Sequence, residues 1–168
     1  MMKTMIATLV ASSALSLSAL LPPPPELVWN ASESVPIGLY AISPAGELKV
    51  THLVLARPPE PLASFLADGG YLPRGVPLLK RVAALPGQRV CRDGLSVSVE
   101  GVLQAEARER DRFGRELPVW TGCRVIADGE VFLLNWDSPA SLDGRYFGPI
   151  PASSIVGRAA PLWVQEEG

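Results

Sequence analysis

The chain has 168 residues, which is enough for one domain of moderate size. With 48% hydrophobic and 19% charged residues, its composition is typical of a folded domain of membrane-associated or secreted character. A net charge of −2 provides no basic field for a nucleic acid, so we expect no nucleic-acid partner. Seventeen prolines and fifteen glycines favour short elements and many turns, and therefore β structure over long helices.

The first 25 residues predict a membrane segment followed by a spacer. Residues 5–21 are uncharged and largely apolar, with Lys3 before them and four prolines after them. As a helix, this stretch would span about 25 Å, close to the roughly 30 Å hydrocarbon core of a bilayer. It is either an uncleaved anchor or a cleaved signal peptide, because small residues near its end suit a cleavage site. We favour the anchor, since the proline run makes a stiff spacer.

The residues that follow predict strands interrupted by one short helix. Residues 27–40 indicate a strand that enters a tight, exposed turn, and residues 47–56 predict a second strand. Residues 61–67 suit a short helix that begins at a proline and ends before two glycines. Residues 78–85 form the most apolar strand-like stretch of the domain.

The second half of the domain continues this pattern. Residues 95–99 alternate apolar and polar side chains, as a half-buried strand does. Residues 104–117 are mostly charged and indicate a solvated loop or ribbon. A strand over 130–135, a loop over 138–149 and a closing strand over 154–164 complete the chain. Together, these elements predict a single, mostly antiparallel β-domain over residues 26–168, behind an N-terminal segment over residues 1–25.

Two cysteines agree with the cellular compartment that the N-terminus predicts for the domain. Because Lys3 stays in the cytoplasm under either interpretation of the N-terminus, we expect the domain in the periplasm, at the inner membrane. Cys91 and Cys123 fit that oxidising compartment. A bond between them would close a loop of about 33 residues and contribute roughly 3–4 kcal/mol, whereas the alternative is two buried thiols. The two cysteines and the single histidine of the chain cannot supply the four ligands of a structural zinc site, so we expect no metal.

Lys80 is the residue that indicates chemistry. Twelve of the fifteen basic residues are arginine, yet a lysine stands in the apolar stretch 78–85. Arginine keeps its proton in proteins, whereas a desolvated lysine can lose it and act as a general base for a serine. Lowering a lysine pKa from about 10.4 by ~3 units requires about 4 kcal/mol. The alternative is that Lys80 extends its amine to water beside Arg81, and composition and spacing do not choose between the two.

A histidine-based site is the weaker hypothesis. His52 is the only histidine, so any Ser-His-Asp triad would depend on that single residue. It lies within the predicted strand 47–56, where a histidine is more often structural.

Three sequence blocks resemble a known family. They are Ser34-Val35-Pro36, the run from Lys80 to Gly87, and the run from Asp143 to Pro149. They resemble the signature blocks of the type I signal peptidases and occur in the order of that family. The match is most similar to the TraF-like branch from conjugative transfer systems, and it covers essentially the whole chain after about Leu27. The resemblance implies an antiparallel β-domain of signal-peptidase type behind an N-terminal apolar helix.

The resemblance also implies roles for individual residues. Ser34 matches the nucleophile, Lys80 the general base, and Ser32 a position whose hydroxyl helps the Ser34 backbone N–H to hold an oxyanion. Such a donor is worth about 3 kcal/mol of transition-state stabilisation. The alternative for Ser32 is a turn-forming serine that bonds its own backbone.

The last block implies supporting residues. Ser141 matches a serine that orients the lysine amine, and Asp143 and Arg145 match a charged pair that supports their loop. Without the resemblance, Asp143-Gly144 would be an ordinary turn. The family often has Gly-Asp-Asn where this chain has residues 135–137 (Asn-Trp-Asp), so no role is transferred there.

These roles predict a membrane-anchored serine endopeptidase without a cofactor. The resemblance implies that it cuts exported precursors after small residues, and that the precursor in the conjugative branch is a pilin subunit. The acyl-enzyme would pass either to water or to the substrate's own amine, which gives a cyclic product. The alternatives are a general signal peptidase with many substrates and a non-catalytic periplasmic scaffold of a secretion or conjugation apparatus.

Overall fold

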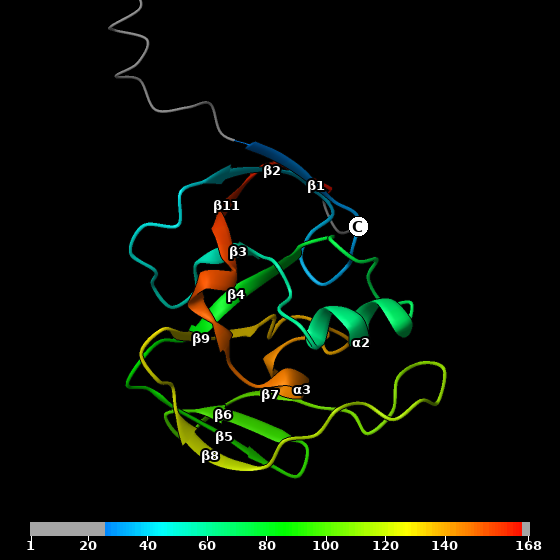
Figure 1. The fold of residues 1–168 in the computed structure, drawn as a ribbon, viewed down its shortest axis with the longest axis vertical. Helices are drawn as coiled ribbons and strands as arrows, with labels where there is room; N and C mark the ends of the chain where they lie inside the picture. Colours follow the sequence, from blue (N-terminus) through cyan, green and yellow to red (C-terminus); the bar gives the residue numbers. More distant parts are fainter. Residues whose placement is uncertain (1–25, 166–168) are drawn as a thin grey trace, which may run out of the picture.

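The computed structural model describes residues 26–165, which fold into two antiparallel β-sheets (Figure 1). The larger sheet contains β1 (Glu26–Asn30), β2 (Gly38–Ser43), β3 (Leu53–Ala56), β4 (Leu78–Ala84), β9 (Glu130–Leu134), β10 (Ile150–Pro151) and β11 (Ile155–Val164). The smaller sheet contains β5 (Arg89–Asp93), β6 (Ser96–Val99), β7 (Val102–Glu106) and β8 (Gly122–Val125). The strand orders are β1-β2-β11-β3-β4-β9-β10 and β7-β6-β5-β8.

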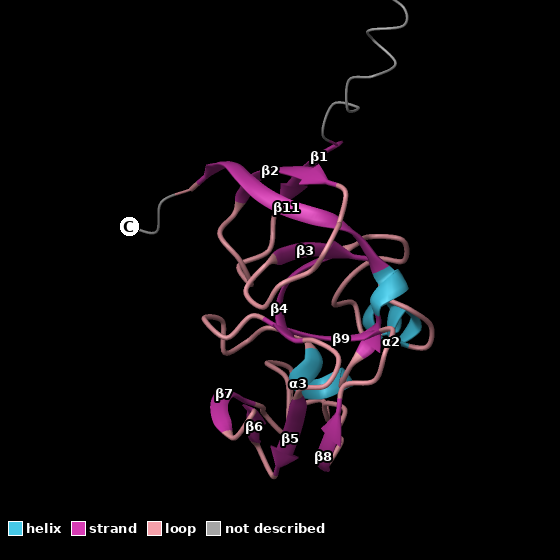
Figure 2. Ribbon diagram, turned by 90° about the vertical axis from the view of Figure 1, so that its left-hand side faces the viewer, coloured by secondary structure: helices cyan, strands magenta, loops and turns pink. Residues whose placement is uncertain are grey.

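Short helices and turns connect the strands. They are α2 (Leu62–Asp68), α3 (Gly144–Phe147) and a 3-10 turn (Ala152–Ser154). Figure 2 shows the smaller sheet at one end of the molecule, with α3 between it and β9. Buried side chains of β4 and β9 pack against those of the smaller sheet, so one core joins the two sheets.

The burial of the strands follows their sequence patterns. β2 buries alternate residues, including Tyr40 and Ile42, because successive side chains of a strand point to opposite faces. β4 and β9 are buried on both faces, which suits their nearly continuous apolar runs. Lys80 is the exception in β4, with 4% of its surface exposed.

Most of the predicted elements are present. The strands expected over 78–85, 95–99, 130–135 and 154–164 appear as β4, β6, β9 and β11, and the predicted helix appears as α2. The mostly β, antiparallel architecture is confirmed. The predicted N-terminal helix lies outside the described residues. Among residues 26–165, no helix is both long and apolar enough to cross a membrane.

Some element predictions were wrong. The strand predicted over 47–56 begins only at Leu53, because the backbone turns first: Thr51 has φ 78° and the His52 N–H donates to the Lys49 carbonyl. β5 and β8 were not predicted, and β7 includes the start of the predicted loop 104–117. The predicted loop 138–149 contains the helical turn α3.

The two cysteines lie in the smaller sheet. Cys91 of β5 and Cys123 of β8 are directly opposed in the antiparallel register and form a disulfide. The bond fastens β8, one of the two edge strands of this sheet, to β5.

Candidate active site

A buried asparagine organises the turn that carries Ser34. Asn30 ends β1 and is paired with Gly38 at the start of β2, so the chain must turn back within the residues between them. The Asn30 side-chain amide donates to the carbonyls of Ser32, Val35 and Pro36 at 2.8, 3.0 and 3.1 Å. An amide that binds three carbonyls fixes the backbone of the turn, and with it the direction of the Ser34 side chain.

Lys80 lies opposite this turn. Its Nζ is 3.5 Å from the Ser34 Oγ and donates to the Ser141 Oγ at 2.8 Å. The amine therefore lies in the protein interior and does not extend into water beside Arg81. The distance to Ser34 is at the long end of hydrogen bonding, as is common for catalytic groups without a bound substrate.

Burial changes the protonation of this lysine. Desolvation lowers the pKa of Lys80 from 10.5 to about 8, because the interior disfavours its charged form. The nearby Asp143 carboxylate acts in the opposite direction, and the Arg145 guanidinium adds a smaller lowering effect. At neutral pH about one Lys80 amine in ten is then uncharged, against fewer than one in a thousand for an ordinary lysine.

Ser32 completes the polar face of the turn. Its Oγ is 3.1 Å from the Ser34 Oγ and hydrogen-bonds to the Asn30 Oδ1 at 3.0 Å. The Ser32 N–H also donates to the Asn30 Oδ1, at 3.2 Å. Both the N–H and the hydroxyl of Ser32 therefore donate to Asn30 within the turn, and the hydroxyl must rotate away from Asn30 before it can donate to an oxyanion.

A buried ion pair supports the loop that carries Ser141. The Arg145 guanidinium donates to both oxygens of Asp143, Nε at 2.8 Å and Nη2 at 3.0 Å, and both side chains are almost fully buried. Arg145 also donates to the carbonyls of Asn135, Ser138 and Pro139. A guanidinium has five donors in a rigid fork, so one side chain can order the whole loop before Ser141.

Besides Asn30, two further residues of this region were missed by the sequence analysis. Asn135 is buried, donates to the Leu79 carbonyl at 3.1 Å and accepts from the Arg81 N–H at 3.1 Å, so it clamps β4 on both sides of Lys80. Its own N–H donates to Asp143 at 3.0 Å, which links the ion pair to the lysine strand. The only signal in the sequence was a polar residue directly after the apolar run of β9.

Arg92 is the second missed residue. Its side chain is 1% exposed and donates to the Arg145 carbonyl at 2.6 Å, and to the carbonyls of Pro118 and Gly94. Its guanidinium also lies over the Tyr146 ring, 5.9 Å from the ring centroid. Arg92 thereby connects the smaller sheet to α3 and the ion pair.

Ser34 and Lys80 open into a cleft of about 960 Å³. Its walls are the turn over 32–37, the loop over 137–142, the end of α2 with the residues after it, and part of the charged segment 104–117. His52 is not among the lining residues; its Nδ1 accepts from the Lys49 N–H, a structural contact. Within residues 26–165, no group of three or more His, Cys, Asp or Glu side chains could hold a metal ion.

The structure thus brings together Ser34, Lys80, Ser32 and Ser141, and places Asp143 and Arg145 directly behind them. Cys91 and Cys123 lie in the other sheet and do not contribute to the cleft. An amine that is partly neutral at pH 7, held near a serine hydroxyl at the wall of a cleft, can serve acyl transfer without a histidine.

Known proteins match this chain over most of its length. It matches the family described as signal peptidase, peptidase S26, over residues 1–164. It is 40% identical over 140 residues to the probable conjugal transfer protein TraF of Sinorhizobium fredii (strain NBRC 101917 / NGR234), which covers 77% of this chain and 73% of that protein. The conjugal transfer protein TraF of Agrobacterium fabrum (strain C58 / ATCC 33970) is 33% identical over 145 residues, 80% of each chain. A solved signal peptidase I from Enterococcus faecalis V583 is similar with 19% identity and a TM-score of 0.43, over 68% of this chain and 97% of that chain.

Proposed function

This chain belongs to the peptidase S26 signal peptidase family and to its TraF-like branch, and we propose that it is a serine endopeptidase with a Ser34–Lys80 dyad. It is anchored at the inner membrane by residues 1–25, with its catalytic domain in the periplasm. The observation that carries the proposal is the buried Lys80 amine, 3.5 Å from the Ser34 hydroxyl and with its pKa lowered to about 8 by desolvation.

The first chemical step transfers one proton. The neutral Lys80 amine takes the proton of the Ser34 hydroxyl while the Ser34 Oγ attacks the carbonyl carbon of the scissile peptide bond. Because Lys80 already donates one N–H to Ser141, its lone pair is held in a limited range of directions. Ser141 therefore acts as a positioning residue for the base.

The tetrahedral intermediate then collapses to an acyl-enzyme. The Ser34 N–H and the Ser32 hydroxyl are the donors for its oxyanion, a contribution of about 3 kcal/mol per donor. The C–N bond breaks, and the leaving amine takes a proton from the Lys80 ammonium. Water, or an amine of the substrate itself, then attacks the ester and restores Ser34.

The relatives' names, conjugal and plasmid transfer proteins, favour a precursor that belongs to a conjugation apparatus. We infer a pilin subunit, cut after a small residue as it emerges from the membrane. An extended peptide fits the cleft between the turn over 32–37 and the loop over 137–142.

The test uses the purified full-length chain in detergent and a precursor with a small residue before the cut. Wild type is expected to cleave it, whereas Ser34→Ala and Lys80→Arg are expected to be inactive, the latter because guanidinium accepts no proton. Mass spectrometry separates a linear product from a cyclic one, since the two differ by one water. Wild-type activity in Lys80→Arg would overturn the dyad, and Lys49→Arg, at an exposed lysine, is the matched control.

A further inference from the structure

The charged segment between β7 and β8 presents arginines to the active-site cleft. Arg110 and Glu116 form an antiparallel bridge, so residues 107–117 are a two-stranded ribbon. Arg108, Arg110 and Arg112 all line the cleft, together with Asp111 and Phe113 at the turn of the ribbon, whereas Glu109 does not.

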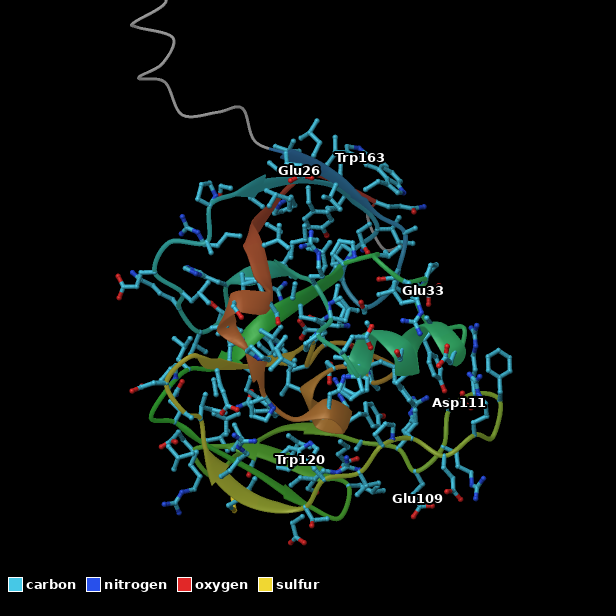
Figure 3. The ribbon with its side chains drawn as sticks, in the orientation of Figure 1. Glu26, Glu33, Glu109, Asp111, Trp120 and Trp163 are labelled. Carbon is cyan, nitrogen blue, oxygen red and sulfur yellow. A yellow bond between two sulfur atoms is a disulfide. The ribbon has the colours of Figure 1, made fainter. Side chains whose placement is uncertain are left out.

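The ribbon is held in place by contacts with the residues after α2. The Tyr71 hydroxyl donates to Asp111 at 2.6 Å, Arg115 forms an ion pair with Asp111, and Arg115 donates to the Gly69 carbonyl at 2.7 Å. In Figure 3, Asp111 lies beside the end of α2, and Glu109 points away from it. Desolvation raises the pKa of Asp111, but the hydrogen bonds from Tyr71 and Arg115 outweigh it and hold this pKa below its ordinary value. Asp111 is therefore already bound by Tyr71 and Arg115.

Two of the three arginines are free to bind a ligand. Arg110 pairs with Glu116 at 3.0 Å, but Arg108 and Arg112 have no carboxylate within 4.0 Å among residues 26–165. Arg112 instead lies over the Phe113 ring at 4.7 Å. Both arginines are exposed, on a ribbon that the Tyr71 and Arg115 contacts fix in position.

We propose that Arg108 and Arg112 form a subsite for an acidic side chain of the precursor, in the cleft that Ser34 also lines. This rests on the proposed function, since the ligand is the substrate of that site. Arginine suits a carboxylate because its guanidinium donates two parallel hydrogen bonds to the two oxygens. A membrane is the less favoured ligand of these arginines. They line the cleft, and Figure 1 places β1, which leads to residues 1–25, at the end of the molecule opposite the smaller sheet.

The binding experiment is independent of catalysis. The full-length Ser34→Ala chain in detergent is titrated with fluorescent peptides that share one neutral sequence and carry a single glutamate, or a glutamine, at each position in turn. Salt of about 0.15 M screens long-range attraction. We expect glutamate at one position to lower the Kd about tenfold or more relative to glutamine, as for charged hydrogen bonds.

A double variant and a matched control assign the effect. Arg108→Gln with Arg112→Gln should abolish the glutamate preference, whereas Arg89→Gln with Arg158→Gln removes the same charge outside the cleft and should keep it. A charge reversal, Arg112→Glu, should shift the preference at that position toward lysine.

The proposal is overturned if no position prefers glutamate, or if the preference survives in the double variant. It is equally overturned if the arginines are needed only for binding to phosphatidylglycerol vesicles. If wild type cleaves neither these peptides nor the precursor, the protease assignment is wrong. The glutamate preference of Ser34→Ala is a binding measurement and is obtained in either case. The two failures are therefore distinguishable.

Discussion

Replacing Lys80 with methionine should remove the activity, together with the pH dependence that burial of this lysine gives to the stability of the folded protein. The lysine pKa falls from 10.5 to about 8 on folding. At 1.36 kcal/mol per unit, a shift of about 2.5 units corresponds to a penalty of roughly 3 kcal/mol for burying the ammonium. Methionine has a side chain of similar length and carries no charge, so it avoids this penalty.

The sign of the pH dependence follows from proton binding. Between pH 8 and 10.5 the unfolded lysine holds its proton while the folded one releases it, so the unfolded state binds more protons and stability rises with pH. Below pH 8 both states are protonated and the full penalty applies. Between pH 8 and 10, the free energy of unfolding of wild type should therefore gain about 2 kcal/mol relative to Lys80→Met.

The assay is urea unfolding of both proteins at pH 7, 8, 9 and 10, followed by tryptophan fluorescence. The difference between the proteins cancels the titration of other groups, such as Tyr40 and Tyr71, whose pKa values are raised mainly by desolvation. Loss of the Lys80–Ser141 hydrogen bond costs about 1.5–3 kcal/mol and so offsets half or more of the gain at pH 7, but it does not change the slope. Lys49→Met, at an exposed lysine, is the control. Parallel pH curves for wild type and Lys80→Met would refute the reasoning.

Three further predictions concern the same network. First, kcat/KM should rise about tenfold per pH unit below pH 8 and level off above it, because only neutral Lys80 is the base; a flat profile between pH 6 and 9 would exclude that role. Second, Arg145→Met should lower the free energy of unfolding by about 3–5 kcal/mol by leaving the Asp143 carboxylate buried and unpaired, and adding Asp143→Asn should recover part of that loss in urea unfolding. Third, Cys91→Ser with Cys123→Ser should cost about 3–4 kcal/mol, from the loss of a cross-link 32 residues apart, yet leave kcat unchanged where the protein is folded; a large fall in kcat would mean that the smaller sheet shapes the site.

The fold could be predicted where burial leaves a pattern in the sequence. β4 and β9 are apolar on both faces and were predicted, as was the alternating β6. β8 is exposed along its whole length, so no apolar period marks it. β5 buries Arg92 at an inward position, where a periodic pattern would require an apolar residue. The missed strands are thus held by pairing and by a disulfide more than by their own hydrophobicity.

The site was predictable only in part. Ser34, Lys80 and Ser141 were identified from blocks that resemble a family. Asn30 and Asn135 act on backbone carbonyls and amides through their side-chain amides. For Asn135 no spacing rule connects the side chain to the backbone groups that it binds, because Arg81 and Leu79 lie 54 and 56 residues away along the chain. Only the folded chain shows that Asn135 bridges the lysine strand and Asp143.

The charges around Lys80 explain why its amine can be both positioned and neutral. A lone carboxylate near the amine would stabilise the ammonium and raise the pKa of Lys80, and a lone guanidinium would lower it further. Asp143 and Arg145 exert these opposing influences from one closely bonded pair, and desolvation remains the dominant cause of the lowered pKa. The pair can therefore order the loop that carries Ser141 through its many hydrogen bonds while adding little net field at the base. A single uncompensated charge at either position would order the loop less well and shift the protonation of the amine at the same time.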